Sequence, residues 1–279
     1  MAQIANSCPF IVLADNTTTM GDTRELAQNY TTANSTQYAA GLFLLERLGI
    51  SPGMRVLDVG CGPGNLTAHI ADLVGNEGSV TGVDPSSERI AIANDIARSN
   101  LSFQEGKAEN LSRFPAASFD VVFVNSTLHW VQDQPAALKE FARVLKTGGR
   151  LGISGGSGDY LTAQEKIKEA VLSREPYRKY PEEEPPKFLK QSELETLLSG
   201  AGLSERKIVI NKIIKATKDA DEMIDWLDTS SSGKTYGGIP VDMRPNARQE
   251  MKTEWNKLLT ADGIRMEMEL LVTVAVKTS

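Results

Sequence analysis

The chain has 279 residues, of which 41% are hydrophobic and 24% are charged, so a sizeable apolar core is expected. This length suits one generous α/β domain, and we predict a single domain over residues 1–279. The net charge of −6 would repel a phosphate backbone unless basic residues gathered on one face, but they are scattered among acidic ones. We therefore expect no nucleic-acid partner.

The two cysteines, Cys8 and Cys61, lie far apart and form no Cys-x-x-Cys pair. Neither a disulfide framework nor a zinc site is predicted, and we expect no metal. A reducing, cytoplasmic location fits this cysteine usage. Residues 1–15 hold a short apolar run with no basic segment before it, so we expect neither a signal peptide nor a membrane partner.

The first predicted element is a helix over residues 38–48, which ends at Gly49. From residue 54 to 159, short apolar runs alternate with amphipathic segments. This alternation predicts βαβ units and a parallel sheet with helices on both faces. The expected strands in this region are 55–59, 79–83, 101–104, 119–124 and 150–154.

The clearest helix follows Asp133, with Pro135 in its first turn and an apolar stripe that includes Leu138 and Phe141. Residues 160–190 come next and are predicted to form an insertion over the sheet. Their segment 181–186, Pro-Glu-Glu-Glu-Pro-Pro, cannot continue a helix and carries too much charge to be buried.

The remaining elements complete the sheet. We predict a helix over 191–199, a sixth strand around 208–214 and a short helix over 219–228. Residues 264–276 alternate between apolar and polar side chains over a dozen positions, a pattern typical of a strand with one buried face.

Residues 56–64, Val-Leu-Asp-Val-Gly-Cys-Gly-Pro-Gly, lie where a strand meets a helix, and their glycines allow a sharp turn close to a ligand. A nicotinamide enzyme is one alternative, with a pyrophosphate on the helix N-terminus, but its spacing is GxGxxG rather than GxGxG. Asp58, two residues before Gly60, would repel a pyrophosphate and attract an ammonium group. Asp84 ends the next strand twenty residues after Gly64, where an acid reaches ribose hydroxyls in Rossmann-type folds. S-adenosylmethionine has an ammonium, a ribose and no phosphate, so these residues favour it as the cofactor.

Over residues 55–153 the sequence resembles the class I S-adenosylmethionine-dependent methyltransferases, with further agreement at 106–109, 118–123 and 137–151. The resemblance implies a Rossmann-like, doubly wound, seven-stranded α/β sheet of order 3-2-1-4-5-7-6, with strand seven antiparallel and a helical cover. It divides the chain into an N-terminal helical segment and cap (1–50), a cofactor-binding core (51–158), an insertion or lid (159–190) and the completion of the sheet (191–279).

Two positions depart from the pattern of that family. Lys107 replaces the usual acid ahead of Ala108 and Glu109, the residues that the resemblance places against the adenine. Arg89 replaces an apolar residue beside the adenine ring, where its guanidinium either stacks on the ring or turns to solvent. The predicted cofactor-binding residues are Tyr30, Asp58, Gly60, Cys61, Gly62, Gly64, Asp84, Pro85, Arg89, Ala108, Glu109, Asn125 and Ser126.

The acceptor is expected outside the carboxyl ends of the strands, near residues 125–130. His129 there is a candidate general base, and the alternative is that it shapes the pocket. Trp130 is predicted either as a flat wall for the acceptor or as a core residue. Residues 30–38 and 128–134 resemble the trans-aconitate and juvenile hormone acid methyltransferase branch, which methylates carboxylates.

That resemblance implies that Gln37 and Trp130 touch the acceptor. The predicted acceptor-binding residues are Gln37, Tyr38, His129 and Trp130. The predicted function is methylation of a small organic molecule, such as a carboxylate in secondary metabolism. The alternatives are N-, C- or phenol O-methylation of a natural product, or a non-catalytic partner subunit built on the same fold.

Overall fold

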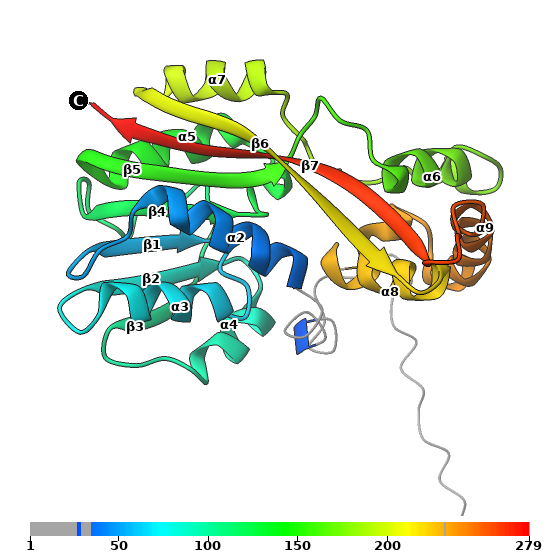
Figure 1. Ribbon diagram of the computed structural model, residues 1–279, viewed down its shortest axis with the longest axis horizontal. Helices are drawn as coiled ribbons and strands as arrows, with labels where there is room; N and C mark the ends of the chain where they lie inside the picture. Colours follow the sequence, from blue (N-terminus) through cyan, green and yellow to red (C-terminus); the bar gives the residue numbers. More distant parts are fainter. Residues whose placement is uncertain (1–26, 29–34, 232, 279) are drawn as a thin grey trace, which may run out of the picture.

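A seven-stranded sheet of order β3-β2-β1-β4-β5-β7-β6 forms the centre of the computed structural model, which describes residues 27–28, 35–231 and 233–278 (Figure 1). β1 to β5 run parallel, and β7 is antiparallel to both β5 and β6. This arrangement confirms the predicted sheet order and the antiparallel seventh strand. The strands are β1 (Arg55–Val59), β2 (Ser79–Asp84), β3 (Leu101–Glu105), β4 (Phe119–Asn125), β5 (Leu145–Gly156), β6 (Leu203–Thr217) and β7 (Ile264–Lys277).

Helices pack on both faces of this sheet and also extend beyond its end (Figure 1). They are α2 (Ser35–Leu48), α3 (Asn65–Val74), α4 (Ser87–Asn94), α5 (Gln134–Val144), α6 (Ala163–Leu172), α7 (Gln191–Gly200), α8 (Ala220–Ser230) and α9 (Arg244–Asn256), with short 3₁₀ turns η1 (Leu128–Trp130), η2 (Tyr177–Lys179), η3 (Lys234–Tyr236) and η4 (Val241–Met243). Among the described helices, none is both long and apolar enough to cross a membrane.

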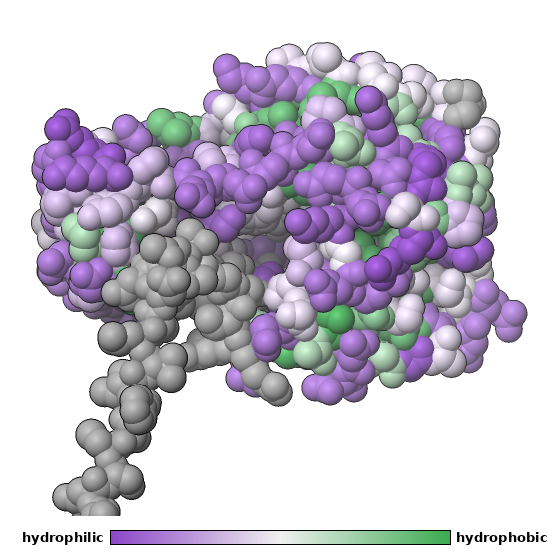
Figure 2. All heavy atoms as spheres, turned by 180° about the vertical axis from the view of Figure 1, so that it is seen from behind, coloured by the Kyte–Doolittle hydropathy of each residue, from purple (hydrophilic) through white to green (hydrophobic). Residues whose placement is uncertain are grey.

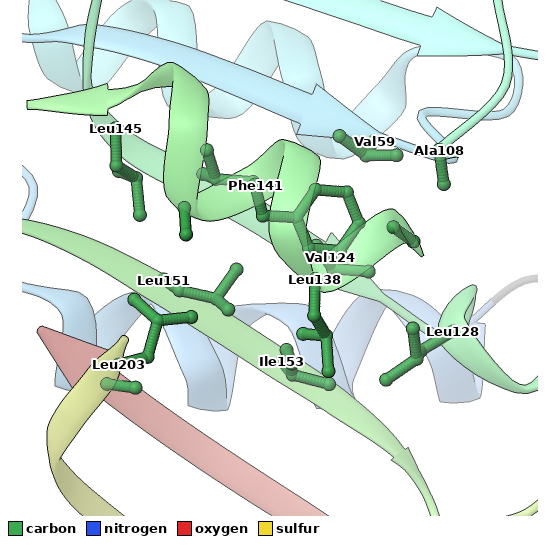
Figure 3. Close-up of a cluster of buried hydrophobic side chains, with 14 of the residues drawn as sticks. Val59, Ala108, Val124, Leu128, Leu138, Phe141, Leu145, Leu151, Ile153 and Leu203 are labelled. Atoms are coloured by element: carbon green, nitrogen blue, oxygen red, sulfur yellow. The ribbon is translucent and has the colours of Figure 1, made fainter. Parts of the chain in front are cut away.

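The apolar stripe of α5 packs on one face of the sheet. Asp133 caps the helix by accepting a hydrogen bond from the Ala136 N–H at 2.9 Å, and Pro135 occupies the first turn. Leu138 and Phe141 are fully buried. Figure 3 shows these two side chains against residues of β4 and β5. A second apolar cluster on the opposite face joins α2, α3 and α4 to the sheet.

A third apolar cluster lies apart from the sheet, in a group of elements that we call the helical cap: α6, α8, α9 and η2 to η4. The cap sits at the end of the long β6–β7 ribbon, and Ile264 and Met266 of β7 belong to its core (Figure 1). Trp255 is the largest fully buried side chain of the molecule's described part and lies in this core. Figure 2 shows that the outer surface on the opposite side of the molecule is mostly hydrophilic.

The structure corrects one expectation about residues 160–190. Ile167, Val171 and Tyr177 of this segment are buried in the cap core rather than laid loosely over the sheet. Glu182, in the acidic proline-flanked run, keeps only 14% of its side chain exposed because it pairs with Lys168 at 2.6 Å. A buried carboxylate is tolerated when an ammonium neutralises it, so the run is not fully solvated.

Candidate active site

The carboxyl ends of β1, β2 and β4 open into a cleft of about 510 Å³. It lies where sites in open α/β sheets are expected, at the point where the strand order reverses. Of the predicted site residues, the cleft is lined by Gln37, Tyr38, Asp58, Gly60, Cys61, Gly62, Asp84, Pro85, Arg89, Asn125, Ser126 and Trp130. The structure thus brings together residues from the carboxyl ends of β1, β2 and β4, from the segments that follow these strands, and from α2.

The glycine loop after β1 is shaped by its backbone. Gly60, Gly62 and Gly64 have φ values of 76°, 55° and 90°, in the left-handed region that favours glycine. A Cβ on Gly60 would lie 2.1 Å from Thr127 Oγ1, so the loop also requires the small residue for close packing. Gly64 does not line the cleft, and a Cβ there would lie 2.7 Å from the Phe103 ring. Gly64 therefore allows close packing against Phe103 at the start of α3.

Asp84 at the end of β2 is held by the neighbouring backbone. Its Oδ2 accepts a hydrogen bond from the Gly62 N–H at 2.9 Å, and its Oδ1 accepts one from the Ser86 N–H at 2.9 Å. Each carboxylate oxygen has two lone-pair directions, so further donors can still be accepted. The side chain is only 6% exposed and borders the cleft, which suits it to bind hydroxyl groups of a ligand.

Asp58 at the end of β1 is a buried carboxylate at the bottom of the cleft. It accepts a hydrogen bond from the Thr67 hydroxyl at 2.7 Å. Burial raises the pKa of Asp58 to about 7; the Thr67 hydrogen bond opposes this shift, and the negative charge of Asp84 adds to it. A cation placed beside this carboxylate would favour its ionised form. Asp58 therefore fits the ammonium of S-adenosylmethionine, and the positive-φ glycine loop leaves room for it.

Besides Gly64, two of the predicted cofactor residues do not line the cleft. Ala108 and Glu109 are absent from its lining, and Ala108 is buried in the apolar cluster on the α5 face, beside Val59 in Figure 3. Tyr30 lies outside the described residues. Cys61 lines the cleft but is buried, and burial raises the pKa of its thiol well above the ordinary value, so it stays a neutral thiol.

A second cavity of about 190 Å³ lies between the sheet and the helical cap. It shares its border with the cleft, and the common lining residues are Gln37, Ser126, Trp130, Ser230, Ser231 and Lys234. The Gln37 side chain donates to Ser230 Oγ at 3.2 Å, and Asn125 Nδ2 donates to the Gln37 carbonyl at 2.9 Å. These bonds join α2, β4 and α8 where the cavities meet. Ser126 takes a left-handed φ of 54° there, unusual for a non-glycine residue, and its N–H donates to Ser154 O at 2.7 Å.

His129 borders the second cavity and not the cleft. Its ring stacks on Phe188, with centroids 4.7 Å apart, and lies 5.0 Å from the Trp130 ring. Burial lowers the pKa of His129 to about 4, so the ring is neutral at pH 7 and accepts a proton poorly. Its Nδ1 has no hydrogen-bond partner among the described residues. The side chain is thus an aromatic wall of the cavity with one acceptor nitrogen.

Several lining residues of the second cavity were not predicted from the sequence. Phe188, Trp226, Lys234 and Leu270 all border it. They come from four separate elements and carry no motif.

The sheet order and the acidic glycine-loop cleft are together those of the class I methyltransferase fold. Residues 50–202, more than half of the chain, match a family model described as a methyltransferase domain. The chain belongs to this methyltransferase domain family.

Individual relatives match shorter stretches. Over 114 residues the chain is 36% identical to the ubiquinone/menaquinone biosynthesis C-methyltransferase UbiE of Shewanella woodyi, covering 39% of this chain and 45% of that protein. Over 157 residues it is 34% identical to an arsenite methyltransferase of Aquipseudomonas alcaligenes, covering 53% of this chain and 44% of that protein. The crystal structure of YcgJ from Bacillus subtilis matches with a TM-score of 0.60 at 20% identity, covering 87% of this chain and 99% of that one. The chain spans about half the length of the curated relatives it matches.

Proposed function

We propose that the protein transfers a methyl group from S-adenosylmethionine to a carboxylate oxygen of a small organic molecule. The observation that carries the proposal is the second cavity, which adjoins the cleft through shared lining residues and lies between the sheet and the helical cap. At about 190 Å³ it is small, since sites for drug-sized ligands occupy roughly 300–1,000 Å³. A compact acceptor fits this space, and the net charge of −6 argues against nucleic acid.

The work of the protein in this reaction is binding and orientation. When bound, S-adenosylmethionine supplies an activated methyl group on a sulfonium that is already a good leaving group. Asp58 holds the ammonium, and Asp84 holds the ribose hydroxyls against the glycine loop. Gln37 and Trp130 border both cavities, so they can fix the acceptor relative to the cofactor. Fixing two reactants in line accounts for a large part of such a rate enhancement.

The state of His129 supports a carboxylate as the acceptor. Burial holds the pKa of this ring at about 4, so it is a poor general base near neutral pH. A phenol or an ammonium must lose a proton before it can be methylated, whereas a carboxylate is already ionised above pH of about 4 to 5. The resemblance of residues 128–134 to the carboxylate-methylating branch points the same way.

The chemical stability of the product tests this proposal. The protein is incubated with methyl-labelled S-adenosylmethionine and a panel of small carboxylic acids, phenols and amines, and the products are identified by mass spectrometry. A methyl ester releases labelled methanol in alkali, whereas N-methyl, C-methyl and ether products retain the label. We expect alkali-labile label on carboxylic acids only. Alkali-stable label would support the N-, C- or phenol O-methylation alternatives, and intact cofactor binding without any labelled product would support a non-catalytic subunit.

A further inference from the structure

Lys234 occupies the junction between the cofactor cleft and the second cavity and borders both. It begins the turn η3, directly after Gly233, whose φ of 78° favours glycine. The Lys234 N–H donates to Ser231 O at 3.1 Å, and its carbonyl accepts from Lys168 Nζ at 3.1 Å. Its backbone is therefore held on both sides, and the half-buried side chain places Nζ 5.5 Å from the centroid of the Trp130 ring.

The other charged side chains around the second cavity have partners of their own. Glu182 pairs with Lys168 at 2.6 Å, and Glu269 pairs with Lys212 at 3.0 Å. Glu165 accepts hydrogen bonds from the backbone and hydroxyl of the residue that caps α6. Within the described part of the chain, no carboxylate oxygen lies within 4.0 Å of Lys234 Nζ. An ammonium held at a partly desolvated junction, with no counter-ion among the described residues, favours binding of an anion.

Part of the wall of the second cavity is apolar and aromatic. Trp130, Phe188, Trp226 and Leu270 border the second cavity. Gln37 lies beside them at the junction, and its buried Oε1 has no partner among the described residues. Ser230, which the Gln37 amide contacts, can donate as well as accept, so that amide can turn either its N–H₂ or its oxygen to a ligand. A ligand complementary to this arrangement carries a carboxylate at one end and an apolar body at the other.

We propose that Lys234 is the specificity-determining residue for the acceptor. Its ammonium pairs with the acceptor carboxylate at the junction, while the apolar body of the acceptor fills the aromatic cavity beneath the helical cap. This inference rests on the proposed carboxylate methylation. It also gives the residue a part in turnover, because the neutral ester that is formed no longer carries the charge that Lys234 attracts.

The test compares carboxylates with their neutral amides. The probes are 3-phenylpropanoate, octanoate and the two corresponding amides, titrated by calorimetry into the full chain saturated with S-adenosylhomocysteine. The variants are Lys234→Met, which keeps the apolar stem, Lys234→Arg, which keeps the charge, and Lys257→Met, a control on an exposed lysine of the cap. Charge-assisted hydrogen bonds of this kind correspond to roughly 10- to 100-fold in affinity. We expect the wild type to prefer at least one carboxylate over its amide by that factor. Lys234→Met should lose the preference, while Lys234→Arg and Lys257→Met should keep it.

The outcomes separate the inference from the proposed function. Equal binding of carboxylates and amides by the wild type, or an unchanged preference in Lys234→Met, overturns the role of Lys234 even if esters are formed. Weaker S-adenosylhomocysteine binding by Lys234→Met also overturns it, because the lysine would then serve the carboxylate of the cofactor. Unchanged S-adenosylhomocysteine affinity also shows that the variant is folded. If Lys234 decides carboxylate binding but the product label is alkali-stable, the inference on binding holds and the proposed ester chemistry fails.

Discussion

Asp58 makes the stability of the free protein depend on pH in an unusual direction. Its pKa is raised from 3.8 to about 7 by burial, a difference that corresponds to about 4 kcal/mol. Between these two values the folded protein retains a proton that the unfolded chain releases. The contribution of Asp58 to stability therefore falls as pH rises through this window, and its full cost applies above pH 7.

The substitution Asp58→Asn removes the ionisable group and keeps an oxygen that can accept the Thr67 hydrogen bond. We expect the free energy of unfolding of the variant, relative to that of the wild type, to increase by about 3 kcal/mol as the pH rises from 5 to 8. The measurement is urea denaturation of both proteins without cofactor across this range. The affinity of the wild type for S-adenosylhomocysteine should change with pH in the opposite direction from its stability. In the wild type it should rise about tenfold between pH 6 and 7.5, as Asp58 ionises, and in the variant it should be weak and flat.

Asp120 provides the matched control, because it lies outside the cleft. Although burial acts to raise its pKa, hydrogen bonds from Lys146 at 2.7 Å and from the Arg55 N–H hold the pKa of Asp120 below the ordinary value. Its stabilising contribution is present above the ordinary pKa near 3.8 and is lost only as pH falls below that value. Asp120→Asn should thus differ from the wild type by a constant amount between pH 5 and 8. If the free energies of unfolding of Asp58→Asn and of the wild type changed equally with pH, the reasoning about Asp58 would be refuted.

Three further predictions concern the site. Asp84→Ala should weaken binding of S-adenosylmethionine by about 1.5 to 3 kcal/mol for each hydroxyl hydrogen bond lost, measured by calorimetry, and an unchanged Kd would contradict the ribose role. His129→Ala should raise the apparent KM, leave kcat within about tenfold of the wild-type value and leave kcat constant from pH 6 to 8, because the pKa of His129 is about 4. A thousandfold loss of kcat, together with a step near pH 6.5 in the wild-type pH–rate profile that the variant lacks, would instead identify the ring as the base. Residues 160–190 and the first turn of α2 should gain protection from hydrogen exchange when cofactor and acceptor are added, and equal exchange with and without ligands would count against a lid.

The sheet was predictable because its signals are local. Short apolar runs predicted β1 to β5, although no helix separates β3 from β4, and alternation along 264–276 indicated β7. The glycine loop and Asp84 were placed by spacing along the chain, and both lie at the cleft. The family resemblance then supplied the order of the strands, which periodicity alone does not give.

The second cavity was less predictable because it depends on contacts between distant segments. Gln37 and Ser230 are hydrogen-bonded although 193 positions separate them in sequence. The charge of Glu182 suggested solvent exposure, and only the fold brings Lys168 against it. Lys234 stands in a short turn with no periodic pattern, so nothing in the sequence distinguishes it from the other lysines of the chain.

The separate apolar core of the helical cap has an evolutionary consequence. The match to the methyltransferase family ends at residue 202, whereas α8, η3 and α9 lie between β6 and β7, after that boundary. Because the cap packs around its own cluster, substitutions there can reshape the acceptor cavity without opening voids beneath the sheet that carries the cofactor cleft. Residues 218–263, which supply α8, η3 and α9, can thus diverge together with the residues of α6 and η2 that share their apolar core, while the sheet and its cleft stay the same.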